Sequence, residues 1–121
     1  KFISEAKKSL LIAAYSLTSE EIAEGITLGK KRVKDFRLLC DKQQAQIKSA
    51  LCSRLGGRID KKSGLMHNKF IVRDNECVLT GSFNFTNNAI KNNRENFIIL
   101  CDKDVAQVYT DEFNKLWQNN T

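Results

Sequence analysis

A chain of 121 residues, with 41% hydrophobic and 28% charged side chains, has the size and composition of one folded domain. This balance excludes an intrinsically disordered protein, and the longest apolar run, residues 9–15, is too short to cross a bilayer. We therefore expect a single domain over residues 1–121. The chain starts at Lys1, so a removed leader or an N-terminal membrane anchor is compatible with the sequence.

The net charge of +6 favours an anionic partner, either a nucleic acid or an acidic membrane surface. Basic residues gather in three short clusters, at 29–34, 58–62 and 91–94. Each cluster is equally typical of a solvated loop or a helix end, so charge alone does not choose the partner.

The first half of the chain alternates between strand-like and helix-like segments. Residues 2–8 resemble the end of a helix, and the near-continuous apolar run at 9–16 predicts a strand that is buried on both faces. Thr18 and Glu21 have the spacing of a capping box, which predicts a helix over residues 18–32.

A second strand over 33–41 and a second helix over 43–55 continue this alternation, and Gly56 and Gly57 provide a helix stop. Strand-helix-strand-helix order indicates parallel strands with helices packed on them. The fold class that we predict is α/β, a mixed, mostly parallel β-sheet flanked by helices.

The second half predicts three more strands, within residues 67–74, 76–82 and 95–102. The first two are separated by Asp74 and Asn75, which indicates a β-hairpin. Residues 103–118 form an amphipathic helix whose apolar stripe we assign to the core. The stripe consists of Val105, Val108, Tyr109, Phe113, Leu116 and Trp117.

Four cysteines show no metal-binding spacing, and the chain has a single histidine, so a zinc site is not expected. Two disulfides or buried free thiols explain them equally well. They are Cys40, Cys52, Cys77 and Cys101.

The single histidine, His67, stands two positions before Lys69, so both side chains would project from the same face of a strand. This pair suits an anion, whose oxygens both groups can face, or a histidine that must stay neutral and nucleophilic beside the ammonium. The next predicted strand ends at Gly81 and is followed by Ser82 and Asn84, which add a hydroxyl and an amide. Such a set of donors suits the oxygens of a reacting phosphate.

The stretch "HNKFIVRDNECVLTGSFNFT" resembles the HKD motif of the phospholipase D superfamily, His-x-Lys-x4-Asp-x6-Gly-Ser. Asn84 and Glu95 stand where this motif is completed, and residues 10–22 are similar to the first strand and helix of the small bacterial endonucleases of the superfamily. The resemblance implies cleavage of phosphodiesters through a phosphohistidine, with no metal and no cofactor.

The resemblance also assigns roles. His67 would be the nucleophile, with Glu95 orienting its ring, and three residues would hold the non-bridging oxygens: Lys69, Ser82 and Asn84. We expect two supporting residues: Gly81, which permits close backbone approach, and Asp74, which supports the turn or a dimer interface.

The family mechanism needs two histidines, and this chain has one. The resemblance therefore implies a two-fold homodimer in which His67 of each subunit meets the other at the interface. Larger relatives carry both motifs in one chain.

Two substrates are compatible with this chemistry. The basic charge and the resemblance to endonucleases favour DNA or RNA, with low sequence specificity and a weak preference for single strands. The alternatives are a lipid phosphodiesterase and a non-catalytic nucleic-acid-binding module, although the latter would ordinarily have lost a site residue.

We expect a periplasmic or envelope location, because small relatives are often exported; membrane association would need an N-terminal segment outside this sequence.

Overall fold

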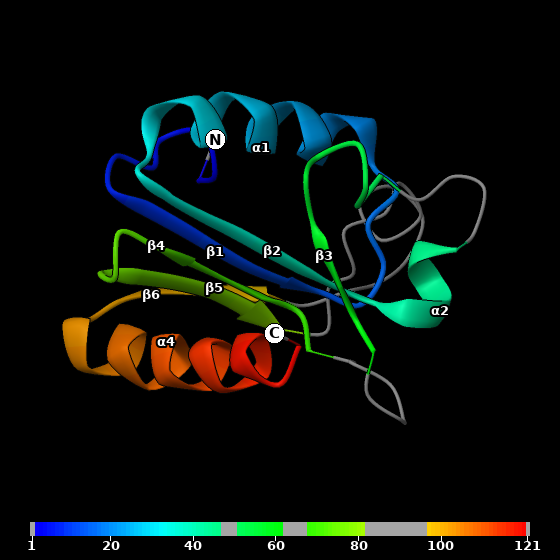
Figure 1. The fold of residues 1–121 in the computed structure, drawn as a ribbon. Coiled ribbons are helices and arrows are strands. Elements are labelled where there is room, and N and C mark those ends of the chain that lie inside the picture. Colours follow the sequence, from blue (N-terminus) through cyan, green and yellow to red (C-terminus); the bar gives the residue numbers. More distant parts are fainter. Residues whose placement is uncertain (1, 47–50, 62–67, 82–96, 121) are drawn as a thin grey trace.

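A six-stranded mixed sheet in the order β3-β2-β1-β4-β5-β6 organises the molecule (Figure 1). This computed structural model describes residues 2–46, 51–61, 68–81 and 97–120. β1 pairs in parallel with β2, and β2 with β3, whereas β4, β5 and β6 each run antiparallel to the preceding strand of the sheet. The strands are β1 (Ser9–Ala14), β2 (Asp35–Asp41), β3 (Arg58–Asp60), β4 (Phe70–Arg73), β5 (Cys77–Gly81) and β6 (Phe97–Cys101). The predicted mixed α/β sheet flanked by helices is confirmed, but it is not mostly parallel. Two strand pairs are parallel and three are antiparallel, because β4, β5 and β6 extend the sheet with alternating direction.

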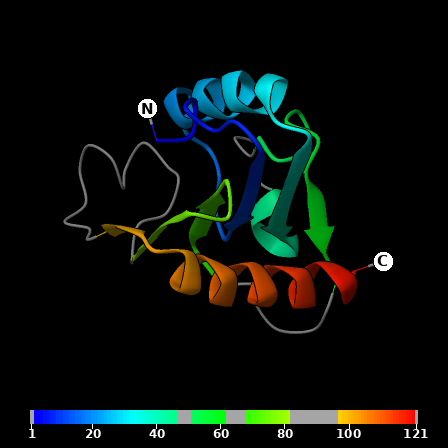
Figure 2. The same ribbon diagram turned by 90° about the vertical axis from the view of Figure 1, so that its left-hand side faces the viewer.

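Two helices cover opposite faces of this sheet, α1 (Glu20–Arg32) on one and α4 (Lys103–Gln118) on the other (Figure 2). Alternate residues of β1 serve the two faces, as a strand requires. Ile12 packs with the core on the α1 side, and Leu11 packs with the core on the α4 side. The continuous apolar run of β1 is therefore explained by burial on both faces.

The N-terminal segment differs from our expectation. Residues 2–5 form turns and not the end of a helix. One backbone bond, from the Ala6 amide to the Ile3 carbonyl (3.2 Å), closes a turn. The following amides, those of residues 7–9, donate to a side chain elsewhere in the fold and are thus unavailable for helix bonds.

Helix α1 is capped one residue later than predicted. The Oγ of Ser19 accepts from the Ile22 amide at 3.3 Å, so Ser19 and not Thr18 is the N-cap. Because Ile22 occupies the third helical position, the reciprocal side-chain bond of a capping box is not formed. Three basic residues in the last turn complement the helix dipole, namely Lys30, Lys31 and Arg32.

The second predicted helix is largely replaced by other structure. α2 spans only Lys42–Ala45, and a turn that includes Gly56 at φ 77° covers residues 52–56. Residues 47–50 lie outside the described part. A disulfide joins Cys40 at the end of β2 to Cys52 in this turn, so the thiols predicted as either free or bonded are paired.

Strand β3 was not predicted, since three residues are too few to show a pattern. It pairs with β2 and contacts the C-terminal helix, where the guanidinium of Arg58 lies 3.8 Å from the centre of the Trp117 ring. The side-chain amide of Asn120 donates to Asp60 at 2.7 Å. Residues 58–60, interpreted as part of a basic cluster, are thus held by tertiary contacts.

The predicted hairpin is confirmed. Asp74 and Asn75 have φ values of 57° and 54°, and the Glu76 amide donates to the Arg73 carbonyl at 3.0 Å. Residues with positive φ at both central positions are typical of the tight turn whose twist matches antiparallel strands.

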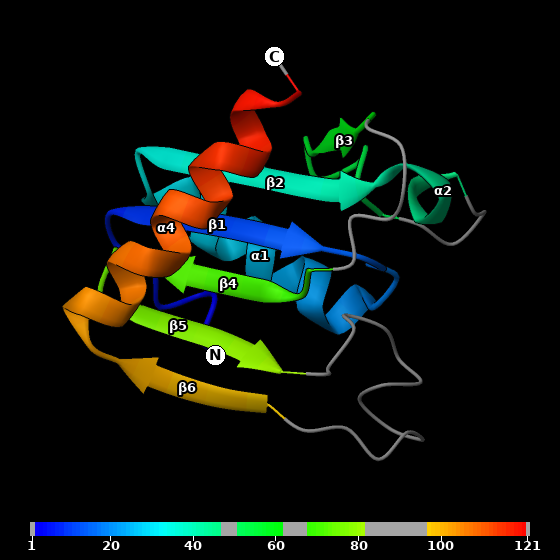
Figure 3. The same ribbon diagram turned by 90° about the horizontal axis from the view of Figure 1, so that it is seen from below.

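Helix α4 has the predicted bounds and crosses the sheet in front of β1 and β4 in the view of Figure 3. Phe113 is fully buried, and most of the predicted stripe packs around it. The assignment of Val108 to the core was wrong, because this side chain is 66% exposed. Within the described residues, no helix has the length and apolar character needed to cross a membrane.

Candidate active site

The ends of several strands lie together on one side of the sheet, which we call the site edge to distinguish it from the outermost strands β3 and β6. β1, β2, β3 and β5 end at this edge, and β4 and β6 start there (Figure 3). Ligands of open α/β sheets bind beyond the carboxyl ends of parallel strands. Tyr15 follows β1, Lys69 precedes β4 and Gly81 ends β5, so all three stand at this edge.

Lys69 lies just outside β4, which begins at Phe70. Its ammonium nitrogen is 5.8 Å from the centre of the Tyr15 ring, and its carbonyl accepts from the Thr80 hydroxyl at 3.5 Å. At 5.8 Å the ammonium is near the outer limit of a cation–π contact, so Tyr15 orients Lys69 only weakly. The positive charge therefore lies at the open end of the β4–β5 hairpin.

Tyr15 and Gln44 were not predicted from the sequence. The side-chain amide of Gln44 donates to the Tyr15 hydroxyl at 3.3 Å, which places α2 beside the ring that Lys69 approaches. The position of Tyr15, directly after a buried strand that ends at this edge, was the available signal. These two side chains extend the polar surface around Lys69.

Four predicted site residues lie outside the described part of the chain: His67, Ser82, Asn84 and Glu95. Described residues that flank them, Asn68, Gly81 and Phe97, stand at the edge that carries Lys69. Gly81 has φ 154°, a conformation that residues with a side chain rarely adopt.

Asp74 lies at the opposite edge. Five residues at about 3.3 Å per residue separate it from Lys69 by roughly 16 Å. Its Oδ1 accepts from the backbone amides of Lys7, Lys8 and Ser9 at 2.9, 2.6 and 3.1 Å. Burial alone would raise the pKa of Asp74, but these bonds and the charge of Arg73 outweigh it and lower the pKa below its ordinary value. Asp74 thus anchors the hairpin turn to the residues before β1.

Two other carboxylates near the candidate site have structural partners. Asp41 accepts from the amides of Gln43 and Gln44, both at 3.1 Å, and so starts α2. Asp60 accepts from Asn120, whose own carbonyl oxygen accepts from the Lys61 amide at 2.7 Å. Both carboxylates stabilise the ends of β2 and β3.

An apolar hollow adjoins this edge. It is lined by Thr80, Gly81, Phe97 and Ile98. Phe97 and Ile98 are 52% and 53% exposed, and they are the first residues of β6. The edge therefore has a polar side near Lys69 and an apolar side at β6.

Comparisons with known proteins show the family of this chain. The family described as "Cardiolipin synthase, PLD-like domain" matches residues 1–117. Mitochondrial cardiolipin hydrolase of Xenopus tropicalis is 34% identical over 93% of this chain and 56% of its own length. Phospholipase D of Rickettsia felis is 34% identical over 88% of this chain and 56% of its own length. The chain thus spans about half the length of these curated relatives.

A solved structure matches over more of its own length. Nuc from Salmonella typhimurium, a phospholipase D family member, superimposes with a TM-score of 0.89 at 28% identity. The match covers 98% of this chain and 84% of Nuc. Together with the family match over residues 1–117, this shows that the chain belongs to the phospholipase D superfamily and has the Nuc fold.

Proposed function

We propose that this protein is a metal-independent phosphodiesterase, an endonuclease that hydrolyses DNA or RNA with low sequence specificity and favours single strands. The match to Nuc over most of both chains carries this proposal. The resemblance of the sequence to the small bacterial endonucleases of the superfamily supports the same class of substrate. The net charge of +6 suits a polyanionic substrate, whose phosphates rather than bases would be contacted.

The proposed reaction has two steps. A ring nitrogen of His67 attacks phosphorus, and the leaving oxygen takes a proton from a second histidine. That second histidine then removes a proton from water, which hydrolyses the phosphohistidine. Glu95 would orient the His67 ring, and the non-bridging oxygens would be held by Lys69, Ser82 and Asn84.

The second histidine comes from a second copy of the chain in this proposal. Each chain has one histidine, and a two-fold axis would bring His67 of both subunits to one phosphate. The site would therefore be complete only in the homodimer.

A lipid phosphodiesterase is the second candidate, because a specific observation favours it. The hollow lined by Thr80, Gly81, Phe97 and Ile98 offers apolar surface beside Lys69's edge of the sheet. Two curated relatives are also named for lipid substrates. Such a surface could contact acyl chains while the same residues cleave the phosphodiester.

We further propose a periplasmic or envelope location. The structure contains two disulfides, Cys40–Cys52 and Cys77–Cys101, and structural disulfides form and persist in oxidising compartments.

The test is cleavage of labelled single-stranded DNA, duplex DNA, RNA and cardiolipin vesicles by the purified protein in excess EDTA. We expect single strands to be cut, with a loss of about 10³-fold or more for His67→Ala. Lys69→Met should lose about 10²-fold. Lys31→Met, which removes an exposed lysine from the end of α1, is the matched control and should keep full activity.

Other outcomes discriminate the alternatives. Cleavage of the vesicles alone would replace the nuclease proposal with the lipid one. Loss of all cleavage in EDTA would contradict the metal-independent mechanism. Full activity of a dilute, demonstrably monomeric protein would contradict the shared site.

A further inference from the structure

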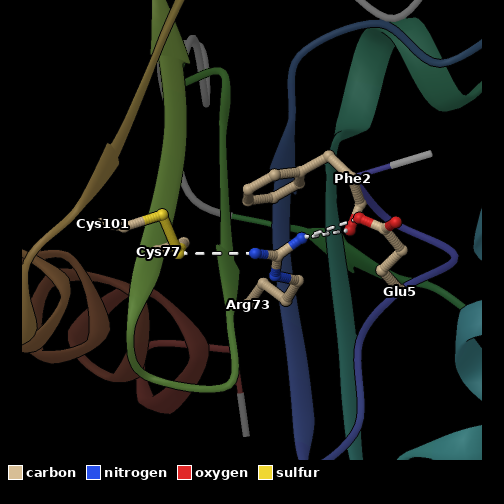
Figure 4. The surroundings of a disulfide bond; sticks show 5 residues. All are labelled: Phe2, Glu5, Arg73, Cys77 and Cys101. Carbon is tan, nitrogen blue, oxygen red and sulfur yellow. Dashed lines mark hydrogen bonds and ion pairs between the residues drawn. A yellow bond between two sulfur atoms is a disulfide. The ribbon is translucent and has the colours of Figure 1, made fainter.

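The second disulfide joins β5 and β6 at the ends of these strands that lie away from the candidate site. Cys77 of β5 and Cys101 of β6 face each other in the strand register, with their Cα atoms 4.0 Å apart (Figure 4). Their surroundings are unequal, since Cys77 is 6% exposed whereas Cys101 is an exposed residue. A reagent from solvent therefore has access on the side of Cys101.

A guanidinium contacts the buried sulfur. Nη2 of Arg73 donates to Sγ of Cys77 at 3.4 Å (Figure 4). Nη1 donates to the Phe2 carbonyl at 3.1 Å and lies 3.5 Å from a carboxylate oxygen of Glu5. The guanidinium also lies 4.3 Å from the centre of the Phe2 ring. These contacts hold a part-buried positive charge, in a side chain that is 20% exposed, against one sulfur of the disulfide.

We propose that Cys77–Cys101 is a thiol–disulfide exchange site, which a dithiol opens by attacking Cys101 and releasing Cys77 as a thiolate beside Arg73. The attacking thiolate forms a mixed disulfide with Sγ of Cys101 as the bond between the two cysteine sulfurs breaks. The second thiol of the reagent then attacks this mixed disulfide. The products are two reduced cysteines and one disulfide in the reagent, so two electrons pass to the protein.

Arg73 determines which sulfur leaves. A thiolate is stabilised by a neighbouring cation, and a more stable leaving thiolate departs faster. Glu5 acts in the opposite direction, because its carboxylate neutralises part of the guanidinium charge. The two residues therefore give the proposal two tests of opposite sign.

The other disulfide is an internal reference. Cys40 and Cys52 are 3% and 2% exposed and belong to the core on the α1 side. A reagent reaches neither sulfur without opening that core. Under native conditions, Cys40–Cys52 should therefore persist while Cys77–Cys101 is reduced.

Reduction would act on the candidate site, a consequence that rests on the proposed function. The chain between Cys77 and Cys101 carries Ser82, Asn84 and Glu95. Every residue of β6 is exposed, so this strand has little burial to hold it when the covalent link is lost. We expect the reduced protein to cleave substrate more slowly.

The exchange is measured on the intact protein with dithiothreitol, by timed alkylation and mass spectrometry of each cysteine pair. We expect Arg73→Gln to slow the opening of Cys77–Cys101 by about 3- to 10-fold, because the leaving thiolate loses its cation. Arg73→Lys keeps the charge and should restore most of the rate. Glu5→Gln, at an exposed position, should accelerate opening by about 2- to 3-fold.

Unchanged rates in both Arg73→Gln and Glu5→Gln, or equal reduction of Cys40–Cys52, would overturn the proposal. Melting temperatures of the oxidised variants separate a slower reaction from a disturbed fold. Cleavage is then compared before and after selective reduction. If the oxidised protein cleaves nothing, the proposed function fails while the alkylation rates still decide the exchange; if reduction leaves cleavage unchanged, the link to the site is wrong.

Discussion

Strands β1 and β6 have similar sequences and opposite surroundings. Both are mostly apolar, "SLLIAA" and "FIILC". Five of the six residues of β1 are buried, whereas all five of β6 are exposed. β1 lies between β2 and β4 with a helix over each face. β6 is the outermost strand of the sheet and pairs with β5. An apolar run thus indicates a strand, but its position in the sheet decides how much stability it contributes.

The largest loss of stability is expected from an isoleucine-to-alanine substitution in β1, and the same substitution in β6 is the comparison. Ile12→Ala in β1 removes a fully buried side chain and should lower the free energy of unfolding by about 2–5 kcal/mol. Ile99→Ala in β6, where the side chain is 46% exposed, should cost less than about 1 kcal/mol. Urea denaturation of both variants measures the difference. Equal losses would show that β6 is buried in solution, for example by a second copy of the chain.

A smaller effect is expected at Asp74, which links the hairpin to the segment that enters β1. Asp74→Asn keeps the left-handed turn conformation but replaces charge-assisted bonds to three amides with weaker ones. We expect a loss of about 1–2 kcal/mol at neutral pH, measured by urea denaturation.

The same carboxylate gives a pH dependence with a defined sign. Its pKa is lower in the folded protein than in the unfolded chain, so its stabilisation is complete above the unfolded value. That stabilisation is lost as the pH falls from about 4 through the lower folded value. Asp74→Asn should therefore converge with the wild type in strong acid. The exposed turn residue Glu76, changed to Gln, is the control; a constant gap between wild type and Asp74→Asn from neutral to acid pH would contradict the assignment.

Effects smaller than that at Asp74 are expected at the two helix caps. Ser19 accepts from the Ile22 amide at the start of α1, and Asp102 accepts from two amides at the start of α4. Substitution of Ser19 or Asp102 by Ala should lower the free energy of unfolding by about 1 kcal/mol, because the helix loses the side-chain acceptor for its first amides. Hydrogen exchange would sharpen the comparison. We expect Asp102→Ala to raise exchange in β6 and α4 while β1 keeps its protection.

The sequence predicts some elements well because local interactions determine them. The tight turn at Asp74 and Asn75 follows from their residue types, which favour positive φ. The bounds of α4 follow from the helical spacing of its apolar residues. The prediction failed where distant groups compete: the amides of residues 7–9 bind Asp74, and three-residue β3 is held by Arg58–Trp117 and Asp60–Asn120 contacts.

The candidate site shows the same division. The resemblance to the HKD motif predicts Lys69 and Gly81 as site residues, and the structure places both where β4 starts and β5 ends. Tyr15 and Gln44 lie 54 and 25 positions before Lys69 in the chain, and no local sequence pattern indicates that they come close to it.

By itself the sequence determined the strands and helices with regular spacing, the family resemblance and the residue types available for phosphodiester chemistry. These depend on neighbours within a few positions, so they are readable along the chain. Only the tertiary structure decided that β1 is central and β6 is the outermost strand, that Asp74 binds the amides of residues 7–9, and that Arg73 contacts the buried half of a disulfide. Each of these depends on which distant segments pack together, because burial, hydrogen bonding and charge act through space.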